Sequence, residues 1–323
     1  MKIFIAMWAM ALLFITESAA AYAMDYRAEM AGLVSDIASY ARLKHPGFII
    51  LANGGASIYK AVDGNTEKTA ASMLDVVDGV MAESVNYGWD MKDGAATPAD
   101  ERAYFLKLLK APKDAGKAVF VLDYVKNERE AVKAYDAAAA EGFTGWSSYD
   151  RWLSEIPQME PEHKNDRACH HLHDAKNYMV LLNPEKYLTQ EEYISALAST
   201  DYDVLIIDLY YDGSSLPPNA VKRLKQKKGG ASRLVLAYMS VGEAEDYRPY
   251  WDQSWQRHRP SWIADKNKDW QGSSKVRYWY PEWRKILYGR KDAYLDQIIA
   301  SGFDGAFLDV VDAYEYFIEQ ERK

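Results

Sequence analysis

The chain has 323 residues, of which 49% are hydrophobic, and its formal net charge is −8. This hydrophobic share excludes a disordered chain, and the acidic balance argues against nucleic acid as a partner, since phosphate contacts need clustered Lys and Arg. An acidic surface instead suits neutral or cationic ligands. Cys169 is the only cysteine, so an intramolecular disulfide is impossible.

Residues 1–23 have the pattern of a secretory leader. Lys2 provides a short basic start, residues 3–15 are an apolar stretch, and residues 21–23 read Ala-Tyr-Ala, which is a typical cleavage site. We therefore expect a secreted or periplasmic bacterial protein; the alternative is a short anchor helix that stays attached. No later apolar run is long enough to span a bilayer, so we expect no membrane contact after cleavage.

Helices and strands alternate along the rest of the chain. Apolar runs predict eight strands, at 47–55, 78–88, 117–125, 142–150, 177–184, 202–213, 232–247 and 305–310. Helical spacing and capping residues predict helices between most of them, at 30–41, 101–110, 128–141, 189–198 and 294–299. A polar stretch, 154–176, separates the fourth strand from the fifth and holds four of the six histidines.

Eight apolar strands with intervening helices predict an α/β protein with a parallel sheet. Eight is the number that closes into a (β/α)8 TIM barrel, and roughly 300 residues suit that fold. The alternative is an open, doubly wound sheet, but no G-x-G-x-x-G follows the first strand. We therefore expect residues 24–323 to form a single barrel, with 154–176 as a linker.

Five of the predicted strands carry an acidic residue at the carboxyl end: Glu83, Asp123, Asp208, Glu243 and Asp309. In a closed parallel barrel these ends meet at one mouth. Splitting two carboxyls into a proton donor and an ionised partner is the basis of glycosidase chemistry. Clustered oxygen ligands would also suit Mg²⁺ or Ca²⁺, which is the competing interpretation.

The longest connection, 247–289, is rich in aromatic residues. It contains six of the ten tryptophans: Trp251, Trp255, Trp262, Trp270, Trp279 and Trp283. Aromatic rings can bury the apolar faces of sugars while nearby acids bind the hydroxyl groups. A small core private to the loop is the other use, and we expect about half of the rings to serve each purpose.

The segment 168–177, ACHHLHDAKN, could be interpreted as a metal site through Cys169, His170, His171, His173 and Asp174. Adjacent histidines rarely chelate one ion, and no H-E-x-x-H or second Cys is present, so a polar linker is favoured. We expect no metal and no cofactor. The role of the histidines between residues 163 and 173 stays open.

Three long segments of the C-terminal half resemble glycoside hydrolase family 114, the endo-α-1,4-polygalactosaminidases. They are RLVLAYMSVGEAEDYRPYW (233–251), VRYWYPEWRKILYG (276–289) and GFDGAFLDVVDAYEYF (302–317). The N-terminal half is similar more loosely, in segments such as HPGFIILANGG and LDVVDGVMAESVNYGWD. In that family the two halves occur in the opposite order, so the resemblance implies a circularly permuted barrel.

The resemblance also implies roles for individual residues. Asp309 corresponds to the nucleophile and Glu83 to the acid/base of a retaining glycosidase, with carboxyl groups about 5–5.5 Å apart. The remaining candidates, expected to bind substrate or support the pair, are Asp208, Glu243, Glu245, Tyr238, Tyr87 and Asp123.

The implied substrate is a partly deacetylated, cationic α-1,4-galactosaminan, which an acidic mouth would attract. Two alternatives stay open. One is a carbohydrate-binding barrel without turnover that assists polysaccharide export. The other is a metal-dependent hydrolase or deacetylase.

Overall fold

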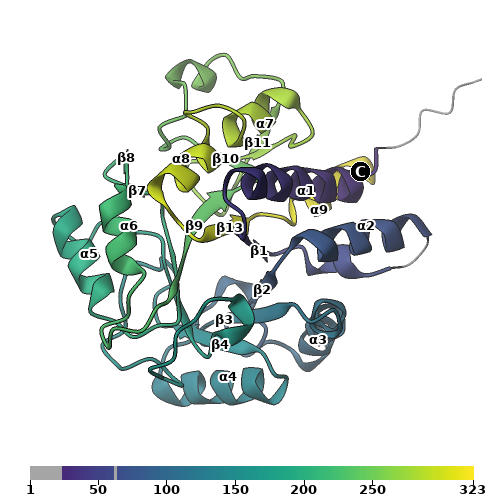
Figure 1. Cartoon of the computed structure of the whole chain (residues 1–323). Helices are drawn as coiled ribbons and strands as arrows, with labels where there is room; N and C mark the ends of the chain where they lie inside the picture. The colour runs from purple at the N-terminus through teal and green to yellow at the C-terminus, as the bar shows by residue number, and fades with distance from the viewer. Residues whose placement is uncertain (1–23, 62–63) are drawn as a thin grey trace, which may run out of the picture.

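Eight parallel strands form one nearly closed sheet, seen at the centre of Figure 1 with helices around it. The computed structural model describes residues 24–61 and 64–323, so the predicted leader, 1–23, lies outside the described residues. The strands are β1 (Ile49–Asn53), β2 (Gly79–Glu83), β3 (Ala118–Tyr124), β4 (Thr144–Ser148), β5 (Tyr178–Leu181), β6 (Val204–Ile207), β9 (Leu234–Ser240) and β13 (Gly305–Asp309).

The order around the sheet is β4-β3-β2-β1-β13-β9-β6-β5. It follows the order along the chain, with the last strand, β13, placed beside the first, β1. The predicted (β/α)8 barrel is therefore confirmed. The circular permutation relative to the family stays a prediction.

The helices cover the outside of the sheet. They are α1 (Tyr26–Lys44), α2 (Gly64–Val76), α3 (Ala99–Asp114), α4 (Glu128–Ala140), α5 (Gln190–Ala198), α6 (Pro218–Leu224), α7 (Pro281–Leu287), α8 (Tyr294–Ser301) and α9 (Ala313–Glu321). All five predicted helices are present, whereas α2, α6, α7 and α9 were missed. Figure 1 shows α1 lying beside α9, and the hydroxyl of Tyr26 donates to Glu321 at 2.8 Å.

Helices on the outside explain why the barrel strands are apolar along their whole length. A strand of this sheet faces the barrel interior on one side and a helix on the other, so both sets of side chains are buried. All five residues of β1 are buried, and the four residues of β6 have no exposed surface. Polar side chains are therefore tolerated chiefly where the strands end.

The barrel closes between β4 and β5 through side chains. The described residues of these two strands form no hydrogen-bonded ladder. Instead the ring of Tyr178 contacts Trp146 at 6.1 Å and Phe120 at 4.8 Å between centroids. The hydroxyl of Thr144 also donates to the carbonyl of Ala175 at 3.3 Å. The edges thus meet through aromatic packing.

Two of the predicted strands are divided in the structure. The run 202–213 gives β6 and then the hairpin of β7 (Tyr210–Tyr211) and β8 (Ser214–Ser215). The run 232–247 gives β9 and then β10 (Glu243–Glu245), which pairs with β12 (Ser273–Val276), itself paired with β11 (Ile263–Lys266). Glu243 therefore lies on a separate three-stranded sheet, not at the tip of a barrel strand as predicted.

A close approach of two backbones explains the break after β9. A Cβ on Gly242 would lie 2.3 Å from the carbonyl oxygen of Val310, so only glycine fits there. The N–H of Val241 still bonds to the carbonyl of Asp309 at 3.0 Å. The chain then leaves the barrel and forms β10.

The connection 149–177 holds one short helical turn, η3 (Leu172–Asp174), and closes the end of the barrel where the strands begin. Leu172 packs against Gly79, the first residue of β2. The ammonium of Lys227 bonds to Asp203 and to the carbonyls of Asn165 and Arg167. A buried ion pair therefore fastens this connection to the residue that precedes β6.

None of the helices within 24–61 and 64–323 has the length and apolar character needed to cross a membrane.

Lys227→Met should lower the free energy of unfolding by about 3 kcal/mol, because the carboxylate of Asp203 would stay buried without its cation. The two side chains are 1% and 2% exposed. Urea unfolding measures the change. Lys186→Met is the matched control, since its pair with Glu155 is 54% and 60% exposed and should contribute less than about 1 kcal/mol. Equal losses in the two variants would contradict this account.

Candidate active site

A cavity of about 1550 Å³ opens where the barrel strands end. It is larger than the roughly 300–1,000 Å³ of an ordinary small-molecule pocket, so it has room for several sugar units. Its floor includes the last residues of β1, β2 and β13, and its rim includes loops after β4 and between β11 and β12. This placement matches the mouth of a (β/α)8 barrel, where such enzymes carry their active sites.

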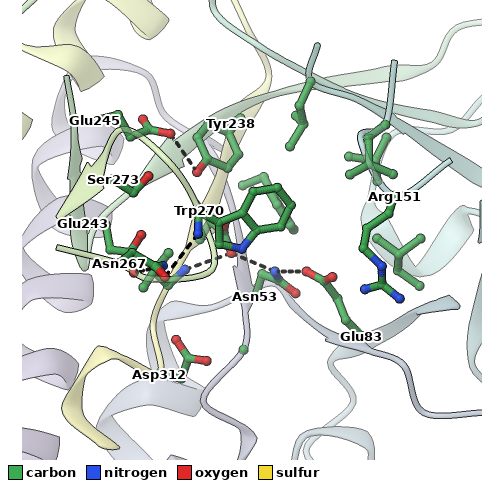
Figure 2. A pocket seen from close by; sticks show the side chains of 18 of the residues that line it. Asn53, Glu83, Arg151, Tyr238, Glu243, Glu245, Asn267, Trp270, Ser273 and Asp312 are labelled. Carbon is green, nitrogen blue, oxygen red and sulfur yellow. Dashed lines mark hydrogen bonds between the residues drawn. The ribbon is translucent and has the colours of Figure 1, made fainter. Parts of the chain in front are cut away.

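The amide of Asn53 joins two carboxylates at the floor of this cavity. Its Nδ2 donates to Oε1 of Glu83 at 2.7 Å and to Oδ1 of Asp309 at 2.8 Å. Figure 2 shows the bond from Asn53 to Glu83. Since both oxygens bond to one nitrogen, they lie within about 5.5 Å of each other. This upper limit is compatible with the roughly 5–5.5 Å between the carboxyl groups of retaining glycosidases.

Each carboxylate of this pair has a second donor. The hydroxyl of Tyr124 donates to Oε2 of Glu83 at 2.6 Å, and the N–H of Val310 donates to Oδ1 of Asp309 at 2.8 Å. Burial and the charge of Glu83 raise the pKa of Tyr124 well above its usual value, so the hydroxyl keeps its proton. The guanidinium of Arg151 lies 3.9 Å above the Tyr124 ring, close enough for a cation–π contact.

The chain turns sharply after each of these three residues. Gly54, Ser84 and Val310 have φ of 76°, 56° and 60°, in the left-handed region. For the β-branched Val310 this conformation is costly, on the order of 1–3 kcal/mol. Such strain is commonly held at functional sites, and here it points the preceding side chain into the cavity while the backbone leaves the strand.

Burial makes the ionised form of Asp309 unfavourable. Loss of water raises the pKa of Asp309 to about 7, and the charge of Glu83 acts in the same direction. The bonds from Asn53 and Val310 oppose this shift. Asp309 therefore keeps its proton to a higher pH than an exposed Asp would.

A second group of charged residues lies beside the pair. Glu243 accepts from Lys275 at 2.5 Å and from Asn267 at 2.8 Å, so its charge is balanced. Asp312 projects into the cavity, and its carboxylate accepts no hydrogen bond from any described residue. Asp312 is exposed to the cavity, and the surrounding cavity walls raise its pKa; Lys275 opposes the shift, and Glu315 adds to it.

Arg248 neutralises two of the predicted acids. Its guanidinium donates to both oxygens of Asp208, at 2.8 and 2.7 Å, and to Glu245 at 2.7 Å. Tyr238 donates to the same Glu245 at 3.3 Å. These side chains reach the cavity wall, but their charges are already paired with a buried cation.

Six of the eight candidates from the sequence line the cavity: Glu83, Asp309, Asp208, Glu243, Glu245 and Tyr238. Tyr87 and Asp123 are not among its lining residues. The carboxylate of Asp123 is buried and accepts from the backbone of Asn86 and Tyr87, so it holds the loop after β2 in place.

Five further residues of the site were missed from the sequence: Asn53, Tyr124, Arg151, Lys275 and Asp312. Asn53 gave one usable signal, since it is the only polar residue in the apolar run 48–53. Tyr124 ends β3, Lys275 lies within β12, and Arg151 and Asp312 lie in the loops after β4 and β13. No sequence pattern distinguishes these four residues from their neighbours.

The tryptophans of the long connection divide less evenly than expected. Of the six, only Trp270 is among the residues that line the cavity. The rings of Trp251, Trp255, Trp262 and Trp283 contact one another in series, and Trp279 packs on Tyr26 and Phe317. The expectation that half would face the mouth was therefore wrong, because most of them form the loop's own core. Trp152, outside this connection, lines the cavity instead.

The histidine-rich segment lies at the other end of the barrel. The N–H of Cys169 bonds to the carbonyl of Ser232, just before β9 begins, and His171 stacks on His173 with centroids 5.2 Å apart. Within the part of the chain that the structure describes, no group of three or more His, Cys, Asp or Glu residues is arranged to hold a metal ion.

Comparison with known proteins identifies relatives of the C-terminal half. The model of glycoside-hydrolase family GH114 matches residues 174–323. An uncharacterized protein of Methanocaldococcus jannaschii is 37% identical over 174 residues, which are 53% of this chain and 49% of that protein. Uncharacterized proteins of Thermotoga maritima and Deinococcus radiodurans are 35% identical over 124 and 123 residues, each covering 38% of this chain. The chain thus spans about half or less of these curated relatives, 49%, 37% and 37% of their lengths.

Asp309→Asn should stabilise the protein more at pH 8 than at pH 5, by roughly 2 kcal/mol. The pKa of Asp309 is about 7 in the folded state, above the roughly 3.9 of an unfolded Asp. Between these values the folded state binds more protons, so Asp309 costs stability as pH rises, and Asn removes that cost. Urea unfolding at both pH values measures the difference.

Asp90→Asn is the control for this experiment. Its exposed carboxylate has its pKa lowered by Lys92, so the substitution should bring no gain at the higher pH. An Asp309→Asn variant that is equally or less stable at pH 8 would show that the carboxyl ionises without a burial cost.

Proposed function

We propose that the barrel hydrolyses an α-1,4-linked galactosamine polysaccharide with retention of configuration, because the model of glycoside-hydrolase family GH114 matches residues 174–323. The observation that carries the proposal is the pair of carboxylates held by Asn53 within about 5.5 Å at the floor of the cavity. In an inverting enzyme a water lies between the general base and the sugar, which requires a wider separation of the two carboxyls; a spacing within about 5.5 Å instead suits direct attack by one carboxylate.

In the first step, an oxygen of ionised Asp309 attacks the anomeric carbon. The glycosidic C–O bond breaks, and Glu83 gives its proton to the leaving oxygen, which produces a glycosyl ester on Asp309. In the second step, Glu83 takes a proton from water, whose oxygen attacks the anomeric carbon and releases Asp309 as a carboxylate. Two displacements at one carbon return the original α configuration.

Neighbouring groups distribute the proton between the two carboxyls. Attack requires Asp309 to be ionised, and Asn53 and Val310 both donate to that form. Burial favours the protonated form and raises the pKa of Asp309 to about 7. The raised pKa of Asp309 is also what a general acid needs, which makes an exchange of the two roles the specific alternative to test.

The charges of the cavity support a cationic substrate. Arg248 balances Asp208 and Glu245, and Lys275 balances Glu243, so these acids offer little net attraction. Asp312 differs, since its carboxylate faces the cavity without a hydrogen-bond donor. An amine of a deacetylated galactosamine unit would supply both the donor and the opposite charge.

Asp309→Asn and Glu83→Gln should each reduce release of soluble fragments from partly deacetylated galactosaminan by at least about 10³-fold, because each removes one partner of both displacements. Binding of the polymer should persist. Reducing-end assays measure the release, and NMR of the first products should show the α anomer. Products with the β anomer would contradict the retaining mechanism.

Turnover of an aryl α-galactosaminide with an activated leaving group shows which of Glu83 and Asp309 is the nucleophile and which is the acid/base. Such a substrate needs no acid, so Glu83→Gln should still release the aryl group in a single burst, whereas Asp309→Asn should not. The reverse pattern would exchange the roles. Binding without turnover by the unsubstituted protein would favour the carbohydrate-binding alternative, and loss of turnover with a chelator would favour the metal-dependent one.

Asp312→Asn should weaken binding of partly deacetylated polymer about tenfold and leave binding of the fully acetylated polymer unchanged, because only the free amine carries charge. Isothermal titration with the Asp309→Asn variant as background measures both affinities. Glu319→Gln, at the outer part of the cavity, is the comparison for general charge effects. Equal loss toward both polymers would contradict amine recognition by Asp312.

We also propose that the protein acts outside the cytoplasm, in the periplasm or the medium. The leader-like pattern of residues 1–23 supports this, as does a polysaccharide substrate too large to enter the cell. The proposed partner is therefore the polymer itself, with neither nucleic acid nor, after leader cleavage, a membrane involved.

A further inference from the structure

Two tryptophans meet above the cavity from different sides of the barrel. Trp152 follows β4, and Trp270 lies between β11 and β12, in the hairpin that pairs with β10. Their ring centroids are 5.6 Å apart at an interplanar angle of 87°, an edge-to-face contact. Both rings line the cavity, and Figure 2 shows Trp270 in front of Asn53, between Glu243 and Arg151.

The exposure of these rings is unusual for tryptophan. Trp152 is 65% exposed and Trp270 is 38% exposed, although a large aromatic side chain is normally well buried. Neither indole N–H forms a hydrogen bond with a described residue. The indole N–H groups of the two rings are therefore available to a ligand.

The backbone beneath each ring is firmly held. The carboxylate of Asp150 accepts from the N–H of Trp152 at 3.0 Å and from the N–H of Ser154 at 2.9 Å. On the other side, Asn267 accepts from the N–H of Trp270 at 3.3 Å while it donates to Glu243 at 2.8 Å. These bonds fix the backbone, so the side-chain torsions are the freedom that remains to each ring.

We propose that Trp152 and Trp270 form an aromatic clasp across the mouth, which the sugar chain parts and whose rings then stack on two of its units. This inference rests on the proposed function, because it takes the polysaccharide as occupant. An edge-to-face contact between two indoles is weak enough for a sugar face to replace it. The free indole N–H groups can then donate to sugar hydroxyls or ring oxygens.

The clasp lies directly over the catalytic pair. A chain that passes between the rings and the floor would bring its glycosidic oxygens to Glu83 and Asp309, and Asp312 lies beside that path. Because the clasp opens by side-chain rotation, an internal segment of a long polymer can enter from above. A free end is not needed, which agrees with internal cleavage.

The test uses the Asp309→Asn protein, which binds without turnover, and partly deacetylated galactosaminan as the probe. Trp152→Ala and Trp270→Ala should each weaken binding about tenfold in isothermal titration, whereas Trp152→Phe and Trp270→Phe should restore most of the affinity, since a phenyl ring also stacks. Tyr149→Ala is the matched control, because Tyr149 is 41% exposed but does not line the cavity.

Circular dichroism follows the opening itself. Two adjacent indoles give an exciton couplet, and the difference spectrum between the Asp309→Asn protein and its Trp152→Phe derivative isolates this pair from the buried tryptophans. The couplet should vanish when the polymer saturates the protein. A couplet that persists, or Ala variants that bind as tightly as their parent, would overturn the clasp. Failure of the parent to bind the polymer would instead overturn the proposed function.

Discussion

The single amide of Asn53 is the interaction on which the site depends. Two carboxylates that repel one another are kept within about 5.5 Å because one nitrogen donates to both. The strand order makes this possible, since β1, which carries Asn53, lies between β13, which carries Asp309, and β2, which carries Glu83. A neutral donor between two acids moderates their repulsion without adding a positive charge that would pair permanently with either.

The backbone around these two carboxylates also helps to hold them at the cavity floor. Positive φ angles at Gly54, Ser84 and Val310 turn the backbone away directly after each functional residue. The glycines that follow Asn53 also make room for the loop after β13, because a Cβ on Gly55 would lie 3.1 Å from the backbone nitrogen of Asp312. Strain at Val310 is compatible with a stable barrel because the buried strands and helices on every side hold the loop in position.

The charges of the mouth show why a count of acids overstates its negative potential. Arg248 lies between Asp208 and Glu245, buried beneath Tyr238 and Tyr247, and forms a fixed ion-pair network. Such a network is costly to desolvate and needs hydrogen bonds to its charged groups; Nη1 of Arg248 donates to both oxygens of Asp208, and Nε donates to Glu245. Among the acids at the cavity floor, those without a cationic partner in the described chain are Glu83, Asp309 and Asp312, so the charge that a ligand meets there is smaller than a count of acids indicates.

The sequence by itself determined the barrel, and it named both carboxylates, Glu83 and Asp309, that the structure brings together at the floor of the cavity. Eight apolar runs with helices between them indicate a closed parallel sheet, because strands covered on both faces need apolar residues throughout, and the run that ends at Asp309 identifies one carboxylate directly. Only the tertiary structure decided which neighbours the acids have. Asn53 is 30 residues from Glu83 and 256 from Asp309, and Arg248 is 40 from Asp208. Lys275 meets Glu243 because the chain bends at Gly242, where β9 gives way to β10. The tryptophans show the same limit. Composition shows that these rings are abundant in the long connection. Whether a ring packs in the loop core or lies over the cavity depends on how far the loop folds back, and residue spacing does not determine that distance.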